Sequence, residues 1–171
     1  MKSIRKMTRL ELAALICSHL KNKGLEITLT GGSCVSIYTN NKYESWDLDF
    51  IETQSISRKE LANYLAELSF YEENRYFKNS ETEIFIEFPP GPLAIGSEPV
   101  SKVIILKAAT GELQIISPTD CVKDRLVAYY FWNDIQCLEQ AVMVSESQEI
   151  DIEEIRRWSK NEGEETKFDF L

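Results

Sequence analysis

The chain has 171 residues, 43% of them hydrophobic, and a formal net charge of −9 at pH 7. This composition is typical of a globular chain rather than a disordered one, and the length suits one domain. No apolar run approaches the roughly 20 residues that a membrane span needs, and the acidic balance argues against binding nucleic acid through bulk electrostatics.

The N-terminal segment starts basic and turns apolar. Glu11, Ser18 and His19 interrupt it and no small-residue cleavage site follows, so we expect no signal peptide. Four cysteines lie far apart without a CxxC spacing: Cys17, Cys34, Cys121 and Cys137. We expect buried free thiols in a reducing compartment, which predicts a cytoplasmic protein. With one histidine and no cysteine pair, we expect no zinc site and a structural or surface role for His19.

The first third of the chain predicts a helix, a strand, a tight turn, a short helix and a second strand. Thr8 and Glu11 form a capping box that starts the first helix. Residues 25–30 predict the first strand, and residues 33–39 could form the short helix. Residues 46–51 predict the second strand.

The middle of the chain predicts a helix, a pair of strands, a loop and a hairpin. A second capping box, Ser57 with Glu60, starts the helix. Pro89 stops the second of the paired strands, and the hairpin turns around Thr110 and Gly111. In chain order these segments are residues 57–68, 74–80, 82–88, 89–99 and 102–117.

The last third predicts helices. Ser117 caps a helix that carries a proline in its first turn and Asp120 at its positive end. Residues 151–158 predict a last helix, and the tail, residues 161–171, is expected to be loose. Four consecutive aromatic residues, 129–132, cannot all face one side of a helix. They predict either an interface with a partner protein or a layer between the sheet and the last helix.

Together these elements predict an α+β fold, with a mixed β-sheet flanked by helices and a short C-terminal helical extension. Residues 1–117 would form the α/β core with its N-terminal helix. Residues 118–171 would form the extension, packed on the core in a single domain overall.

Two aspartates stand one residue apart in an apolar strand. Side chains alternate along a strand, so Asp47 and Asp49 share one face. The other face would carry Trp46, Leu48 and Phe50 into the core. Two carboxylates held this close repel each other unless a cation lies between them, and hard oxygen ligands suit magnesium. Alternatively, the aspartates simply face solvent on a half-exposed strand.

A glycine-rich turn precedes this strand. Gly31, Gly32 and Ser33 stand between a predicted strand and a predicted helix. Such a turn can hold phosphate oxygens through its backbone N–H groups, or it can be a tight connection that needs a positive φ. A phosphate-holding turn followed by a metal-holding pair is more specific than either feature alone.

This combination resembles the nucleotidyltransferase fold superfamily, the polymerase-β-like group. Its signature is a helix-opening Gly-Gly or Gly-Ser turn, a gap of about ten or more residues, and Asp-x-Asp on a strand. Gly32 and Ser33 match the turn, and Asp47 and Asp49 match the pair. The flanking residues, Thr30 among them, also look like the AbiEii-type branch and related toxin-like members.

The resemblance implies a third carboxylate on a neighbouring strand. Glu87 lies between Ile86 and Phe88 in an apolar segment and is the preferred candidate. Glu83 would share its face but stands at the entrance of the strand. The family often has aspartate at this position, so the longer glutamate is a departure that puts the metal geometry in question.

The helix after the hairpin also resembles that branch, in which a basic residue, commonly lysine, precedes a small one. Here that position is Arg125, with Lys123 as the alternative. The family has a later Lys-Asp pair, of which only the aspartate is present here, in Asn133-Asp134. All of these residues could equally be solvated charges on an amphipathic helix. The resemblance covers roughly residues 25–140.

The resemblance implies a magnesium-dependent enzyme that moves a nucleoside monophosphate from a nucleoside triphosphate to a hydroxyl of RNA, a protein or a small molecule. The residues implied to bind the nucleotide are Gly31, Gly32, Ser33, Arg125 and Lys123. The residues implied to be catalytic and to bind two magnesium ions are Asp47, Asp49 and Glu87.

Two classes of function stay open at this point. The complete set of motif residues favours the enzyme, in a toxin–antitoxin or phage-defence setting. The short chain and the glutamate at the third position favour a non-catalytic binding or antitoxin-like regulatory module with the same fold. A third possibility is that the turn and the aspartates are purely structural.

Overall fold

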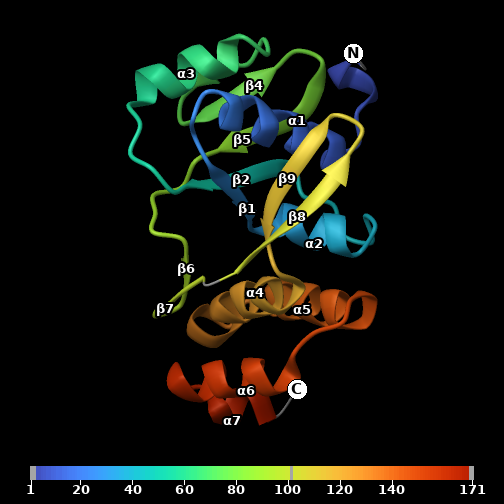
Figure 1. Ribbon diagram of the computed structural model, residues 1–171. Helices are drawn as coiled ribbons and strands as arrows, with labels where there is room; N and C mark the ends of the chain where they lie inside the picture. The colour runs from blue at the N-terminus through green and yellow to red at the C-terminus, as the bar shows by residue number, and fades with distance from the viewer. Residues whose placement is uncertain (1–2, 101, 170–171) are drawn as a thin grey trace.

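The computed structural model describes residues 3–100 and 102–169. A seven-stranded sheet lies between helices, and further helices form a layer at one end of the molecule (Figure 1). No helix in the described part of the chain is long and apolar enough to cross a membrane.

The helices are α1 (Arg9–Asn22), α2 (Gly32–Tyr38), α3 (Arg58–Ala66), α4 (Pro118–Trp132), α5 (Ile135–Ser147), α6 (Ile152–Asn161) and α7 (Glu165–Asp169), after a short 3-10 turn at Ile4–Lys6. The strands of the main sheet are β1 (Ile27–Thr30), β2 (Asp47–Glu52), β3 (Tyr71–Glu73), β4 (Tyr76–Asn79), β5 (Thr82–Glu87), β8 (Val103–Ala108) and β9 (Gly111–Ile116). A separate ribbon pairs β6 (Ala94–Ile95) with β7 (Glu98–Pro99). Both predicted capping boxes are present, at Thr8 and at Ser57.

The strand order is β3-β4-β5-β2-β1-β9-β8. Two of the pairings are parallel, β2 with β5 and β1 with β9, and the others are antiparallel. The mixed α+β fold predicted from the sequence is therefore confirmed. The parallel register places Asp47 opposite Phe85 and Asp49 opposite Glu87.

One face of the sheet forms the core. Leu48 and Phe50 of β2 and Ile86 of β5 are fully buried, as their alternation with the acidic residues requires. Helix α1 packs against β1, β8 and β9, and α3 packs against β3 (Figure 1). The prediction that Trp46 also points into the core was wrong, because its side chain is 52% exposed. The ladder with β1 ends at the pair Thr30–Asp49, so no β1 residue flanks Trp46.

Helix α2 begins at the glycine turn and connects the sheet to the C-terminal helices. It packs against β1, β2, α4 and α5. The Tyr38 hydroxyl donates a hydrogen bond of 2.6 Å to the carbonyl of Ile116, where β9 leads into α4. This bond joins the C-terminal end of α2 to the C-terminal end of β9.

Several local predictions were wrong. Strand β3 was not expected, and the segment predicted as a loop contains the β6–β7 ribbon. Helix α5 was not predicted as a separate element: Asn133 ends α4 in the left-handed conformation at φ 53°, and Asp134 then caps α5. The tail is not loose as far as it is described: α7 forms, and Phe168 packs against the core. Residues 170–171 lie outside the described part.

The aromatic run of α4 divides between the two predicted roles. The Tyr130 ring is buried and stacks on Trp158 of α6 at a centroid distance of 5.8 Å. Phe131 and Trp132 are exposed, and Trp132 is 73% accessible. A partner at these two residues stays a prediction.

The other local expectations concern His19 and the cysteines. His19 Nε2 lies 2.8 Å from the carbonyl of Tyr64, which is a structural role that joins α1 to α3. The four cysteines are free: Cys17, Cys34 and Cys121 are buried and Cys137 is partly buried.

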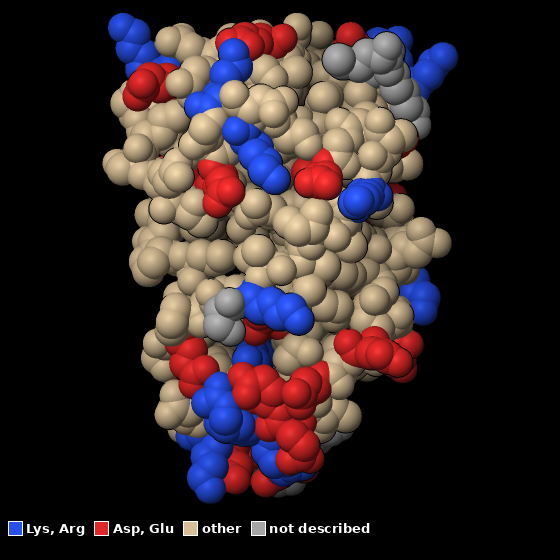
Figure 2. Space-filling view, viewed as in Figure 1, with Lys and Arg blue, Asp and Glu red and all other residues tan. Residues whose placement is uncertain are grey.

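Charged side chains of both signs gather over α6 and α7, at the lower end of the view in Figure 2, while the middle of that face is mostly uncharged. Ion pairs at this end include those of Arg156 with Asp169 and of Arg157 with Glu98. Because charges of both signs are mixed on this face, its described residues do not present a basic surface of the kind that holds nucleic acid.

Candidate active site

Three carboxylates meet on the face of the sheet opposite α1 and α3. Asp47 and Asp49 come from β2, and Glu87 comes from β5. One oxygen from each lies within 4.8 Å of the others. We call this group the acidic trio. Glu83, the alternative third carboxylate, is not part of it and lies near the start of β5.

The surroundings of the trio disfavour the charged form of one of its members, Asp49. Burial raises the pKa of Asp49 to about 7, and the neighbouring Asp47 and Glu87 carboxylates contribute to the increase. Outside the trio, Arg75 Nε lies 3.1 Å from Glu87 Oε1. The trio is thus a site of concentrated negative charge that favours a cation.

Asp47 is held in place by its neighbours. The Ser45 hydroxyl donates a hydrogen bond to Asp47 Oδ1. The buried Arg9 guanidinium donates to the carbonyl of Ser45, so the N-terminal helix supports the segment that leads into β2 and its two aspartates. The Ser33 hydroxyl donates to the backbone carbonyl of Asp47 and is fully buried. A phosphate contact from Ser33 stays a prediction.

The glycine turn approaches the trio closely. Gly31 has φ +73°, and a Cβ built on it would lie 2.4 Å from Asp49 Oδ2. A Cβ on Gly32 would lie 3.0 Å from Ser45 Oγ. Glycine at position 31 therefore meets both a backbone and a space requirement, and the turn is held against the carboxylates.

A cleft of about 400 Å³ opens beside the trio. One side is formed by the trio and Gly31, and another by Asp124 and Arg125 of α4. The third side is the segment after β5, which we call the proline wall: Pro89, Pro90, Pro92, Leu93, Ala94 and Ile95. Since the cleft adjoins both the turn and the carboxylates, a ligand bound in it could contact both.

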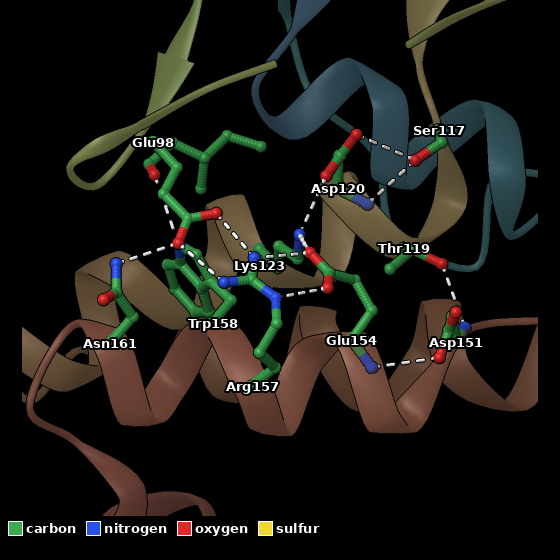
Figure 3. A network of polar contacts seen from close by, with 11 residues as sticks. Glu98, Ser117, Thr119, Asp120, Lys123, Asp151, Glu154, Arg157, Trp158 and Asn161 are labelled. Carbon is green, nitrogen blue, oxygen red and sulfur yellow. Dashed lines mark hydrogen bonds and ion pairs between the residues drawn. The ribbon is translucent and has the colours of Figure 1, made fainter. Parts of the chain in front are cut away.

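The two basic candidates of α4 differ in position. Arg125 lines the cleft, donates to Asp124 at 2.5 Å and to Gln140 at 3.3 Å, and is largely buried. Burial alone would lower the pKa of Arg125, but the Asp124 carboxylate more than offsets this effect and raises it. Lys123 does not line the cleft. It pairs instead with Glu154 at 2.6 Å and Asp120 at 3.3 Å, as Figure 3 shows.

The same network anchors the proline wall to α6 (Figure 3). Arg157 donates to both carboxylate oxygens of Glu98, at 3.0 and 2.6 Å, and Asn161 donates to Glu98 at 2.9 Å. Trp158 Nε1 donates to the carbonyl of Ile95 at 3.2 Å. The C-terminal helices therefore position one side of the cleft through the β6–β7 ribbon.

Sequence reasoning missed four residues at the site. Ser45 and Asp124 adjoin predicted site residues along the chain, so proximity in sequence was a usable signal. Arg9 lies 36 residues from Ser45 and contacts it only through the fold. Arg75 stands in the turn between β3 and β4, and this turn could not be identified because β3 was not predicted.

The donor set of the trio fits a divalent cation. Three carboxylates supply hard oxygen ligands of the kind that magnesium binds. Burial, followed by the neighbouring Asp47 and Glu87 carboxylates, raises the pKa of Asp49, so a cation bound there would favour its charged form. The trio could therefore hold a metal ion through Asp47, Asp49 and Glu87.

No protein-family model matches the chain, and no curated protein matches it. Among solved structures, it is similar to an antigenic nucleotidyltransferase-like protein from Paracoccidioides brasiliensis. The TM-score is 0.56 at 9% identity, over 80% of this chain and 75% of that one. It is also similar to ANT(2'')-Ia in complex with adenylyl-2''-tobramycin. That TM-score is 0.54 at 15% identity, over 95% of this chain and 98% of that one. These likenesses show that the chain has a nucleotidyltransferase-like fold.

Proposed function

We propose that this chain is a metal-dependent nucleotidyltransferase, which transfers a nucleoside monophosphate from a nucleoside triphosphate to a hydroxyl group. The observation that carries the proposal is the position of the acidic trio. On a nucleotidyltransferase-like fold, three carboxylates lie within 4.8 Å of one another, against a glycine turn and at the side of a cleft. Fold alone does not set function, whereas the chemistry of this site does.

Each residue of the site has a role in the proposal. Asp47, Asp49 and Glu87 hold magnesium, with two ions expected from the resemblance. When bound, the metal neutralises phosphate charge and lowers the pKa of the attacking hydroxyl. The glycine turn lets the triphosphate approach the carboxylates closely, and Arg125 supplies positive charge from the lining of the same cleft. The protein mainly contributes positioning and charge stabilisation.

The surface charge bears on the acceptor. A net charge of −9 is more compatible with a small-molecule acceptor, a protein acceptor or a basic partner protein than with an extended RNA-binding surface. The structural neighbour ANT(2'')-Ia is seen with an adenylyl group on tobramycin, which is a small-molecule acceptor. We therefore favour a small molecule or a protein over RNA.

The biological setting stays a prediction from the sequence. It rests on the resemblance to AbiEii-type enzymes, which implies a cytoplasmic toxin–antitoxin or phage-defence protein. The chain is proposed to act as one domain, with a core of residues 1–117 and a helical extension of residues 118–171.

The test is transfer of label. The protein is incubated with magnesium and each α-labelled nucleoside triphosphate, and with total small RNA, total cell protein or a panel of hydroxylated small molecules. We expect label to appear in one acceptor class and to disappear in the double variant Asp47→Asn, Asp49→Asn. Absence of transfer together with absence of magnesium–nucleotide binding by calorimetry would leave a non-catalytic module that keeps the fold.

A further inference from the structure

Arg75 forms an ion pair with Glu87 of the acidic trio. It stands in the turn between β3 and β4, and its Nε lies 3.1 Å from Glu87 Oε1. The two side chains differ in exposure: Arg75 is 70% accessible and Glu87 is 21% accessible. A mostly exposed guanidinium thus pairs with a largely buried carboxylate that the proposed function assigns to a metal.

The backbone at Arg75 is anchored although its side chain is exposed. Arg58 of α3 donates a hydrogen bond of 2.6 Å to the carbonyl of Arg75 and also donates to Glu72 of β3 at 2.8 Å. The Arg75 guanidinium lies over the Tyr76 ring, 5.0 Å from its centroid. The side chain can therefore leave Glu87 without a change in the backbone of the turn.

A guanidinium and a divalent cation cannot both occupy Glu87 without strong repulsion, because charges of the same sign would stand within a few ångströms of each other. The Arg75–Glu87 pair is mostly exposed on the arginine side, and exposed pairs contribute little stability. Displacing Arg75 from Glu87 therefore costs little free energy, but this cost still weakens metal binding.

We propose that Arg75 is an internal counter-ion of the acidic trio: it pairs with Glu87 when no metal is bound and is displaced when a divalent cation binds. This inference rests on the metal assignment in the proposed function. Its consequence is that the wild-type chain binds a free divalent cation less tightly than the trio alone would.

The test is a titration of the full-length protein with Mn²⁺ in the absence of nucleotide, at low salt, with free Mn²⁺ followed by electron paramagnetic resonance. The variant is Arg75→Gln. The matched control is Lys78→Gln, which removes the same charge from the same hairpin, where Lys78 pairs with Glu73 rather than with the trio. Circular dichroism confirms that each variant is folded.

We expect Arg75→Gln to bind Mn²⁺ about threefold to fivefold more tightly than wild type, because an exposed competing ion pair is lost. Lys78→Gln should stay within about twofold of wild type. In a Glu87→Gln background, the Arg75→Gln change should have no further effect. Equal or weaker binding by Arg75→Gln, or an equal gain in Lys78→Gln, overturns the counter-ion role while leaving the metal site intact. No Mn²⁺ binding by any variant overturns both.

Discussion

Gly31 and Asp49 share a space that admits only one side chain, because a Cβ on Gly31 would lie 2.4 Å from Asp49 Oδ2. Gly31 follows β1 as the N-cap of α2, and Asp49 lies in β2, the next strand along the chain. The turn is therefore fitted to the carboxylate, so the proposed metal site and the glycine turn depend on each other's geometry.

Substituting Gly31 tests this fit. Gly31→Ala should lower Mn²⁺ affinity at least about tenfold, because the new methyl group displaces the Asp49 carboxylate. It should also lower the free energy of unfolding by about 1–3 kcal/mol, because φ is +73°. The measurements are a Mn²⁺ titration and urea unfolding.

Gly24→Ala is the control for backbone strain. Gly24 also has a positive φ, +83°, but a Cβ there would meet nothing within 4 Å. This variant should lose stability and keep its Mn²⁺ affinity. Equal Mn²⁺ affinities for the two alanine variants would contradict the close fit of Gly31 and Asp49.

The raised pKa of Asp49 predicts a dependence of stability on pH. The folded-state pKa is about 7 against an ordinary value of 3.8, so the metal-free folded state binds the proton more tightly than the unfolded state does. Asp49 therefore lowers stability progressively as pH rises from about 4 to about 7, and its full cost is present above that range.

Asp49→Asn should remove this cost. Without metal at pH 8, the variant should unfold with a free energy about 1–3 kcal/mol higher than wild type. The gain should shrink at pH 5, where Asp49 is mostly protonated in the folded protein. The measurement is urea unfolding in EDTA at the two pH values. A gain that is the same at both would show that ionisation of Asp49 is not its cause.

The anchoring of the proline wall by α6 predicts a local change in dynamics. Arg157→Gln removes the ion pair with Glu98 and should speed hydrogen exchange of the amides at residues 94–98 by about threefold to tenfold. Arg156→Gln is the matched control on the same helix, because Arg156 pairs with Asp169 instead. Equal exchange in both variants would mean that Arg157 does not hold the wall.

Features with a local signal could be predicted from the sequence. The capping boxes at Thr8 and Ser57 mark the starts of α1 and α3, since a cap involves residues only three apart. The alternation in β2 placed Asp47 and Asp49 on one face, and the apolar neighbours of Glu87 selected it over Glu83 as the third carboxylate.

Features that depend on tertiary contacts could not be predicted. Strand β3 has three exposed residues and so carries no apolar alternation to identify it. The same holds for the contact of Arg9 with Ser45 and the pairing of Arg75 with Glu87, because each joins segments whose adjacency comes only from the fold. Trp46 was misplaced because alternation shows which face a side chain is on but not whether that face is covered there.

The central claim is that the acidic trio binds a divalent cation. The most direct measurement is a Mn²⁺ titration of the wild-type chain and of the double variant Asp47→Asn, Asp49→Asn, at pH 8 and low salt. We predict saturable binding to the wild type that is at least about tenfold weaker in the variant, with both proteins folded by circular dichroism. Equal binding by the two proteins, or no saturable binding by either, would contradict the claim and leave the trio without its proposed role.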